Sequence, residues 1–166
     1  MANHFSSRGR VKNTFKSSPA KKSGIPSLVV SEAFATITDR PDFNADDILL
    51  GSGRRTISIS AQAAEFGSYE YRVINFILDL SIQSGSYTFT KGEPGLILGM
   101  SYVEFAVIGG NEIYHNCEGL TGSLNLSIVG STFNIADFSF SALDSEQKEI
   151  TLKGRVNVSS TLCTCS

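Results

Sequence analysis

Histidine is scarce in this chain, which has two histidines in 166 residues. A catalytic set of serine, histidine and acid needs a histidine that can take a proton. His4 lies in a basic N-terminal segment, so His115 is the only other base, and no Gly-x-Ser-x-Gly elbow accompanies it. We therefore expect a protein that is not an enzyme and needs no cofactor, with a hydrolase centred on His115 as the alternative.

Long apolar runs are also missing. No stretch approaches the roughly 20 apolar residues that a membrane-spanning helix requires. The N-terminal positive charges are not followed by an apolar run, so we find no secretory signal peptide. This predicts a cytoplasmic location, with export by a route without a signal peptide as the alternative. In the cytoplasm the three cysteines would stay reduced.

Helical periodicity is absent as well. No window of about eleven residues or more repeats apolar positions every 3.6 residues, which leaves no crossover helices for a parallel α/β fold. Short alternating segments are instead separated by Gly and Ser turns about every 8–12 residues. Eleven Phe, five Tyr and fifteen Gly agree with this pattern. The predicted fold is all-β, an antiparallel β-sandwich or a jelly-roll-like barrel.

The expected strands are separated by polar turns. Gly109-Gly110-Asn111 is predicted to form a tight hairpin turn, and a polar loop is expected around Pro41 to Asp47. On the segment before the hairpin turn, Tyr102, Glu104 and Ala106 alternate with Val103, Phe105 and Val107. The predicted extended segments are residues 27–38, 54–63, 71–82, 87–90, 100–108, 112–117, 122–129 and 149–158.

The stretch FNIADFSFSA, residues 133–142, changes the parity of its apolar positions near Ala136 and Asp137. Successive side chains of a strand point to opposite faces, so the slip indicates a β-bulge there. Asp137 should point outward from the bulge. The side chains expected to face the core are Phe133, Ile135, Phe138 and Phe140.

Charge divides the chain into a basic arm and an acidic body. The first 24 residues carry six basic residues and no acid, which leaves eight basic and sixteen acidic residues for the rest. We predict an arm at residues 1–26, one β-sandwich domain at residues 27–160 and a cysteine-containing tail at residues 161–166. An acidic body repels phosphate, so nucleic acid could bind only through the arm. The arm contacts would be Arg8, Arg10, Lys12, Lys16, Lys21 and Lys22.

Two sets of residues resemble metal ligands. Asp42, Asn44 and Asp46 match the start of a calcium loop, although Asp47 stands where that loop needs Gly and Gly53 where it needs Glu. A solvated acidic loop is the simpler interpretation. A second set would bind zinc through one histidine and three cysteines, namely His115, Cys117, Cys163 and Cys165.

The simpler interpretation of the second set is structural. His115 and Cys117 share a face of their strand, and His115 would then be a residue of a hairpin edge. Cys117 would be a small buried side chain, with Cys163 and Cys165 in a frayed tail. A disulfide from Cys117 to a tail cysteine is a further alternative in an oxidising compartment.

The tyrosines are candidates for ligand binding, because tyrosine joins an apolar ring to a polar tip. Rings exposed on strands could stack on sugars or anchor a protein partner. The alternative is that these tyrosines are half-buried strand residues with the hydroxyl at the rim. The candidate residues are Tyr69, Tyr71, Tyr102 and Tyr114.

Four segments together resemble a layout found in small bacterial β-sandwich proteins of unknown function, which are often lipoproteins. They are Gly-Ser-Tyr-Thr-Phe at residues 85–89, Gly-Ser-Leu-Asn-Leu-Ser-Ile at 122–128, Phe-Ser-Phe-Ser-Ala at 138–142 and Ile-Thr-Leu-Lys-Gly at 150–154. The resemblance covers about residues 54–158 and implies no functional residue. The chain departs from those lipoproteins in lacking a signal and an N-terminal lipidation cysteine.

These features predict a binding module whose partner is another protein or further copies of the chain, assembled through the basic arm on an acidic body. One alternative is a carbohydrate-binding domain that uses surface tyrosines. Another is a small coat-type protein whose arm contacts nucleic acid.

Overall fold

The computed structural model describes residues 31–66 and 69–159. Within these ranges the chain forms ten β-strands and no helix, and every strand pair is antiparallel. The predicted all-β antiparallel fold is therefore confirmed. The strands are β1 (Glu32–Ile37), β2 (Arg40–Asn44), β3 (Asp47–Ser52), β4 (Thr56–Phe66), β5 (Tyr69–Asp79), β6 (Gly85–Thr90), β7 (Ile97–Ile108), β8 (Asn111–Val129), β9 (Thr132–Leu143) and β10 (Glu149–Ser159).

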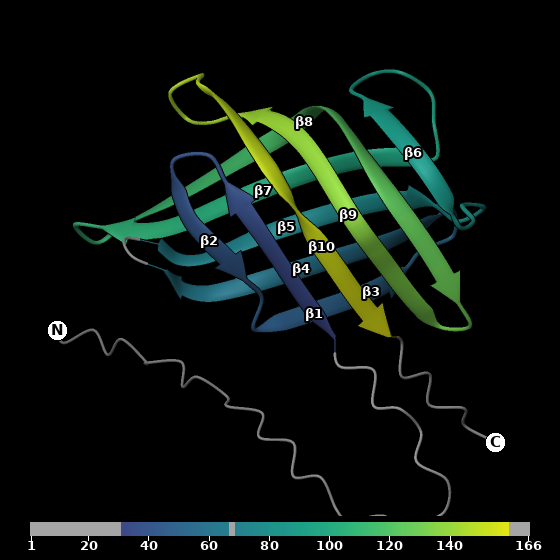
Figure 1. Ribbon diagram of the computed structural model, residues 1–166. Coiled ribbons are helices and arrows are strands. Elements are labelled where there is room, and N and C mark those ends of the chain that lie inside the picture. Colours follow the sequence, from purple (N-terminus) through teal and green to yellow (C-terminus); the bar gives the residue numbers. More distant parts are fainter. Residues whose placement is uncertain (1–30, 67–68, 160–166) are drawn as a thin grey trace, which may run out of the picture.

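The strands belong to one sheet with the order β2-β1-β10-β9-β8-β7-β5-β4-β3, and β6 also pairs with β8. The sheet curls strongly into a half-barrel, so that β1, β9 and β10 cross in front of β4, β5 and β7 (Figure 1). β8 belongs to both halves, because its first part pairs with β7 and its second part with β6 and β9.

The core lies on the concave side of the curled sheet. Ile59, Phe76, Phe140 and Leu152 come from both halves and are at most 1% exposed. Phe76 meets Phe138 edge to face, with ring centroids 5.0 Å apart. The apolar stripes of the alternating strands thus meet in one continuous core. Among the described residues there is no helix with the length and apolar character needed to cross a membrane.

The prediction of two separate strands at residues 112–117 and 122–129 is wrong, because β8 runs through both. Two glycines let β8 pass close to its neighbours. A Cβ on Gly119 would lie 2.8 Å from the carbonyl oxygen of Met100, and one on Gly122 would lie 2.6 Å from the Cβ of Phe140. These glycines therefore serve close packing within a strand rather than a turn.

The expected polar loop around Pro41 to Asp47 is also wrong, since this segment forms β2 and the start of β3. Phe43 is fully buried and alternates with the exposed Asp42 and Asn44. The backbone N–H of Ala45 donates to the carbonyl of Ala33 at 2.9 Å. Burial of Phe43 and pairing with β1 thus hold this segment as a strand despite the turn preference of its neighbours. The neighbouring residues show no strand pattern in the sequence.

The predicted bulge in β9 is confirmed. Gly154 of β10 pairs with Phe138 and Val156 pairs with Ile135, so Ala136 and Asp137 together face Arg155. Ile135, Phe138 and Phe140 are buried, Phe133 packs partly buried against the core, and Asp137 is exposed. The parity slip therefore marks the point where β9 bends.

Candidate functional site

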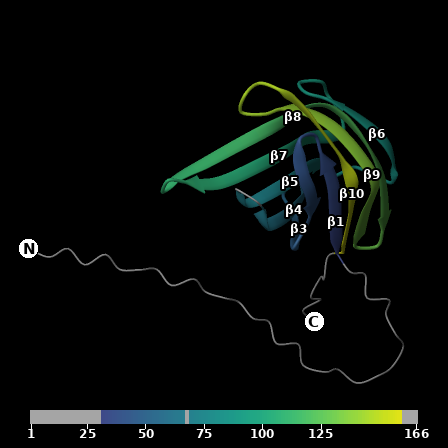
Figure 2. The same ribbon diagram turned by 60° about the vertical axis from the view of Figure 1, so that its left-hand side comes forward.

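The hairpin formed by the ends of β7 and β8 extends beyond the strands beside it. Ile108 pairs with Asn111, and Gly109 and Gly110 between them have φ angles of 60° and 82°. The predicted tight turn is therefore confirmed, and positive φ at both positions explains the glycines. β5 pairs with β7 only as far as Phe105, and β9 pairs with β8 only from Gly119 onward. The hairpin therefore projects as a two-stranded ribbon (Figures 1 and 2).

The ribbon carries apolar side chains on both faces. Four of the ten exposed large hydrophobic residues in the described part of the chain lie between residues 107 and 114. Val107 and Tyr114 lie on the outer face of the sheet, and Ile108 and Ile113 lie on the inner face. The side chains of Ile108, Ile113 and Tyr114 are 46–62% exposed. Such a concentration on a projecting element makes the ribbon a candidate interaction site.

An aromatic row crosses three strands at the base of the ribbon. Tyr71 of β5 pairs with Phe105 of β7, which in turn pairs with Tyr114 of β8. The rings of Tyr71 and Phe105 stack with centroids 4.7 Å apart and planes 11° apart. We call the row and the ribbon together the hairpin surface, which consists of Tyr71, Phe105, Val107, Ile108, Ile113 and Tyr114.

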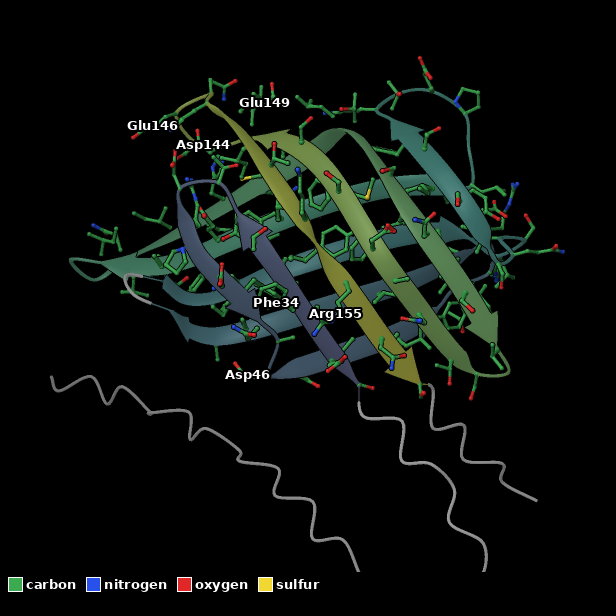
Figure 3. The ribbon with its side chains drawn as sticks, viewed as in Figure 1. Phe34, Asp46, Asp144, Glu146, Glu149 and Arg155 are labelled. Carbon is green, nitrogen blue, oxygen red and sulfur yellow. The ribbon has the colours of Figure 1, made fainter. Side chains whose placement is uncertain are left out.

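A cluster of charged side chains lies buried where the ribbon joins the body. Arg40 Nε donates to Glu104 Oε1 at 2.8 Å, and Arg40 Nη2 donates to Asp144 Oδ2 at 3.2 Å. Arg72 is fully buried and donates to the carbonyls of Pro41 and Asp42, each at 2.8 Å. The cluster ties β2, β5, β7 and the β9–β10 loop together, and Figure 3 labels Asp144 in that loop beside Glu146 and Glu149.

The expectation that Tyr102 is a surface ligand residue is wrong, because its side chain is fully buried. The predicted alternation along β7 separates its two faces correctly. The face that points into the core is the one that carries Tyr102, Glu104 and Ala106. Burial, and then the charge of Glu104, raise the pKa of Tyr102 well above its ordinary value. Tyr102 therefore belongs to the buried cluster, whereas Tyr71 and Tyr114 belong to the hairpin surface.

His115 and Cys117 share the inner face of β8, as predicted, opposite Glu104 and Tyr102 respectively. Cys117 is fully buried. Burial, and then the charge of Glu104, raise the pKa of its thiol to about 12. Because the thiolate is the nucleophilic form, burial and the raised pKa both lower the reactivity of Cys117 at neutral pH.

The predicted zinc set is only half placed, since Cys163 and Cys165 lie outside the described residues. In the predicted calcium set, Asp42 and Asn44 lie on the exposed face of β2, and Asp46 accepts a hydrogen bond from the Ala64 backbone at 2.7 Å. Residues 31–66 and 69–159 hold no group of three or more His, Cys, Asp and Glu side chains placed to bind a metal ion.

Other predicted site residues lie outside the part that the structure describes. These are the side chain of Tyr69 and all six arm residues, Arg8, Arg10, Lys12, Lys16, Lys21 and Lys22.

A hollow of about 290 Å³ lies on the outer face where β6 and β7 diverge along β8. Lys91 and Glu118 form an ion pair at this hollow. Asn75 accepts a hydrogen bond from Ser60 at 2.7 Å and donates one to Ser101 at 3.3 Å. Asn75, Ser101, Lys91 and Glu118 of this hollow thus already have polar partners, and the hairpin surface is the stronger candidate.

Sequence reasoning missed Phe105, Ile108 and Ile113 as surface residues. Their alternation is that of an ordinary half-buried strand, and exposure depends on where β5 and β9 stop pairing. It also missed Arg40, Arg72 and Asp144, whose partners are distant in the sequence. No family model matches the chain, and comparisons with curated proteins and with solved structures find no match either.

Proposed function

We propose that this protein is a non-enzymatic interaction module that binds a protein partner through the hairpin surface. The observation that carries the proposal is the concentration of exposed apolar side chains on a ribbon that extends beyond the folded body. Aromatic and aliphatic side chains of this kind provide most of the binding energy at the centre of protein interfaces.

The orientation of the aromatic rings favours a protein partner over a carbohydrate. Tyr71 and Phe105 stack on each other, so each ring already uses one of its faces. A sugar ring stacks on the open face of an aromatic ring, and Tyr114 is the most exposed member of the row at 62%. One open ring supports a sugar poorly, whereas stacked rings flanked by aliphatic side chains suit a protein surface.

The chemistry near the ribbon supports a role in binding. The Cys117 thiol stays protonated, and His115 lies half-buried beside Glu104 rather than next to a hydroxyl nucleophile in its cross-strand pair. The single positive charge of Arg40 is paired with two carboxylates inside the fold. These groups therefore hold the base of the ribbon in place.

The test compares three full-length proteins. The double variant Ile108→Ser with Ile113→Ser removes apolar surface from the ribbon. The matched control, Leu49→Ser with Val129→Ser, removes side chains that are 61% and 74% exposed elsewhere. Proteins captured from a lysate of the source cells are identified by mass spectrometry, and each candidate is purified and its affinity measured by calorimetry.

We expect the purified partner to bind the wild type and the control equally, and the ribbon variant at least about ten-fold more weakly, which is about 1.4 kcal/mol. Circular dichroism and the urea midpoint must show that the ribbon variant is folded. A partner that binds all three proteins with the same affinity contradicts the proposal.

A further inference from the structure

The first part of β8, residues 111–118, has an open edge. On one side these residues pair with β7, from Ile108↔Asn111 to Ser101↔Glu118. On the other side β9 begins to pair only at Gly119, so within the described ranges no strand lies along residues 111–118. Such an edge offers N–H and C=O groups for pairing with another strand.

The hairpin turn determines which backbone groups face this edge. A two-residue turn closes on a pair that exchanges both hydrogen bonds, here Ile108 and Asn111. Bonding then alternates along β8, so that the backbone groups of every second residue are directed away from β7. The residues whose N–H and C=O face the open edge are Glu112, Tyr114, Asn116 and Glu118.

The other ends of the sheet are better protected. β2 carries Pro41 between Arg40 and Asp42, and proline and charge both hinder strand addition. β3 and β6, each paired on one side only, have six residues each, a length that limits pairing. The edge of β8 is eight residues long, lacks proline and carries the exposed Ile113 and Tyr114. It is thus the edge of the described sheet most open to strand addition.

We propose that a second copy of this chain pairs with this edge in an antiparallel manner, about a two-fold axis at Tyr114. This inference rests on the proposed function and names its partner. Antiparallel pairing of an edge with itself satisfies the symmetry of a homodimer. The axis places Tyr114 opposite Tyr114 of the second copy and Glu112 opposite Asn116, and all these residues have backbone groups facing the edge.

Charge disfavours two of the alternative registers. An axis at His115 would place Glu112 opposite Glu118, and an axis at Glu112 would place that carboxylate opposite itself; like charges in such positions are destabilising. An axis at Ile113 avoids both clashes but forms fewer hydrogen-bonded pairs. At Tyr114 the aromatic row of Tyr71, Phe105 and Tyr114 continues without a break into the second copy.

The ribbon also keeps the two bodies apart. Beyond the first 24 residues the chain has eight basic and sixteen acidic residues, so two bodies repel each other at close range. Within the hairpin surface no side chain is charged, and the ribbon projects from the body (Figure 2). Contact through the ribbon therefore joins two acidic molecules at a point away from their bodies, where the edge carries only Glu112 and Glu118 as acidic residues.

The test uses two matched substitutions at one residue of the full chain. In the monomer Asn116 pairs with Val103, so a charge there meets no charged neighbour across the strand pair. In the dimer, each Asn116 lies opposite Glu112 of the other copy, so the pair occurs twice. Asn116→Lys should therefore tighten the dimer and Asn116→Glu should weaken it, with dissociation constants at least about ten-fold apart by analytical ultracentrifugation.

A backbone test accompanies the charge test. Tyr114→Pro removes an N–H that faces the open edge and spares the bonds to β7, and it should yield a monomer, whereas Tyr114→Phe should stay dimeric. In the wild type, hydrogen exchange at the amides of Glu112, Tyr114 and Asn116 should slow as protein concentration rises.

Three results would overturn the second copy as partner. The first is a wild type that is monomeric at all concentrations. The second is a dimer whose dissociation constant is unchanged by the substitutions at Asn116. The third is a dimer that dissociates at high salt, and this result would assign assembly to the basic arm. If the wild type is monomeric and its captured protein partner no longer binds the Ile108→Ser, Ile113→Ser variant, the proposed function still holds. If that partner also fails to bind Tyr114→Pro, the edge pairs with a strand of the partner protein.

Discussion

Two arginines, the fully buried Arg72 and the partly buried Arg40, hold β2 against the opposite half of the sheet. Arg72 reaches from β5 to two carbonyls of β2, and its guanidinium lies 5.5 Å from the centre of the Phe43 ring. Arg40 reaches from β2 to Glu104 of β7. Buried ion pairs add little net stability, but removing one partner leaves an uncompensated charge. The pairs therefore fix where β2 lies more than they stabilise the fold.

On the outer face of the other half, Phe34 of β1 and Arg155 of β10 lie side by side (Figure 3). The guanidinium of Arg155 is 5.8 Å from the centre of the Phe34 ring, and its Nε lies 3.8 Å from a carboxylate oxygen of Glu32. Both Arg155 and Glu32 side chains are exposed, so water and salt weaken these contacts. Arg155 therefore does far less to hold its strands in place than Arg40 and Arg72 do for β2.

The β9 bulge allows a sharp comparison between adjacent residues. Phe138 is 4% exposed and packs against Phe76 and Phe140. Phe138→Ala should lower the free energy of unfolding by roughly 3–5 kcal/mol, as a buried phenylalanine truncation does. Asp137 is exposed and accepts a hydrogen bond from Asn125 at 2.7 Å, so Asp137→Ala should cost about 1 kcal/mol or less. Urea denaturation at neutral pH measures both.

Equal effects of the two substitutions would contradict this assignment of inward and outward residues at the bulge. A large effect of Asp137→Ala alone would place the aspartate, rather than the aromatic ring, in the core.

Among the elements, β8 is the one that joins the two halves of the sheet. Its path depends on the absence of a side chain at Gly122, where a Cβ would lie 2.6 Å from atoms of Met100, Ser139 and Phe140. We expect Gly122→Ala to destabilise the protein by about 1–3 kcal/mol, because the neighbours must shift to admit the methyl group. The midpoint of urea unfolding reports this loss.

Gly99 of β7 provides the matched control. A Cβ there would meet nothing within 4 Å, and the residue lies in a strand without positive φ. Gly99→Ala should therefore be neutral or slightly stabilising. If both alanine variants behave alike, close packing does not explain the glycine in β8.

Elements with clean alternation were predictable from the sequence, and those defined by distant partners were not. The apolar stripe of β4 and the parity slip of β9 at Ala136 are local patterns that the structure reproduces. β2 has one buried side chain, Phe43, and its strand conformation depends on pairing with β1 and on contacts with Arg72. No local pattern records such partners.

The same distinction applies to the candidate site. Tyr71 and Tyr114 were recognisable as amphipathic strand residues, but their alignment through Phe105 results from the register of three strands. Exposure of Ile108 and Ile113 depends on where neighbouring strands end. A sequence pattern reports which residues share a face and leaves open whether another element covers that face.

At the scale of the whole molecule, Asp144 fastens one end of the curled sheet. Hydrogen bonds from the Lys148 and Glu146 backbone and the nearby Arg40 hold the pKa of Asp144 below its ordinary value of 3.8. A carboxyl with a lowered folded pKa contributes stability above its unfolded pKa, and this contribution disappears as pH falls through the folded value. The stability of the wild type should therefore decline from about pH 4 downward.

Asp144→Asn tests this prediction. The variant should be less stable than the wild type at pH 7, and the difference between their urea midpoints should shrink as pH falls below about 4. Lowered pKa values at Asp39, Asp79 and Glu118 leave both proteins with some further acid sensitivity. Glu146→Gln, in the same loop, shows the general effect of losing one exposed carboxylate. A constant difference between the Asp144 variant and the wild type at every pH would be inconsistent with the proposed role.

The pairing of β1 with β10 has a consequence for how the protein is made. Glu32 lies opposite Asn157, so the first described strand takes its place in the sheet beside the last one. Contacts between such distant residues form slowly, because a long stretch of chain must be ordered first. On the ribosome β1 and β2 emerge long before β10 is synthesised, and during that time Arg40 and the apolar stripe of β1 have no completed sheet to join. The nascent chain thus stays open to chaperones and to neighbouring chains until translation has passed β10.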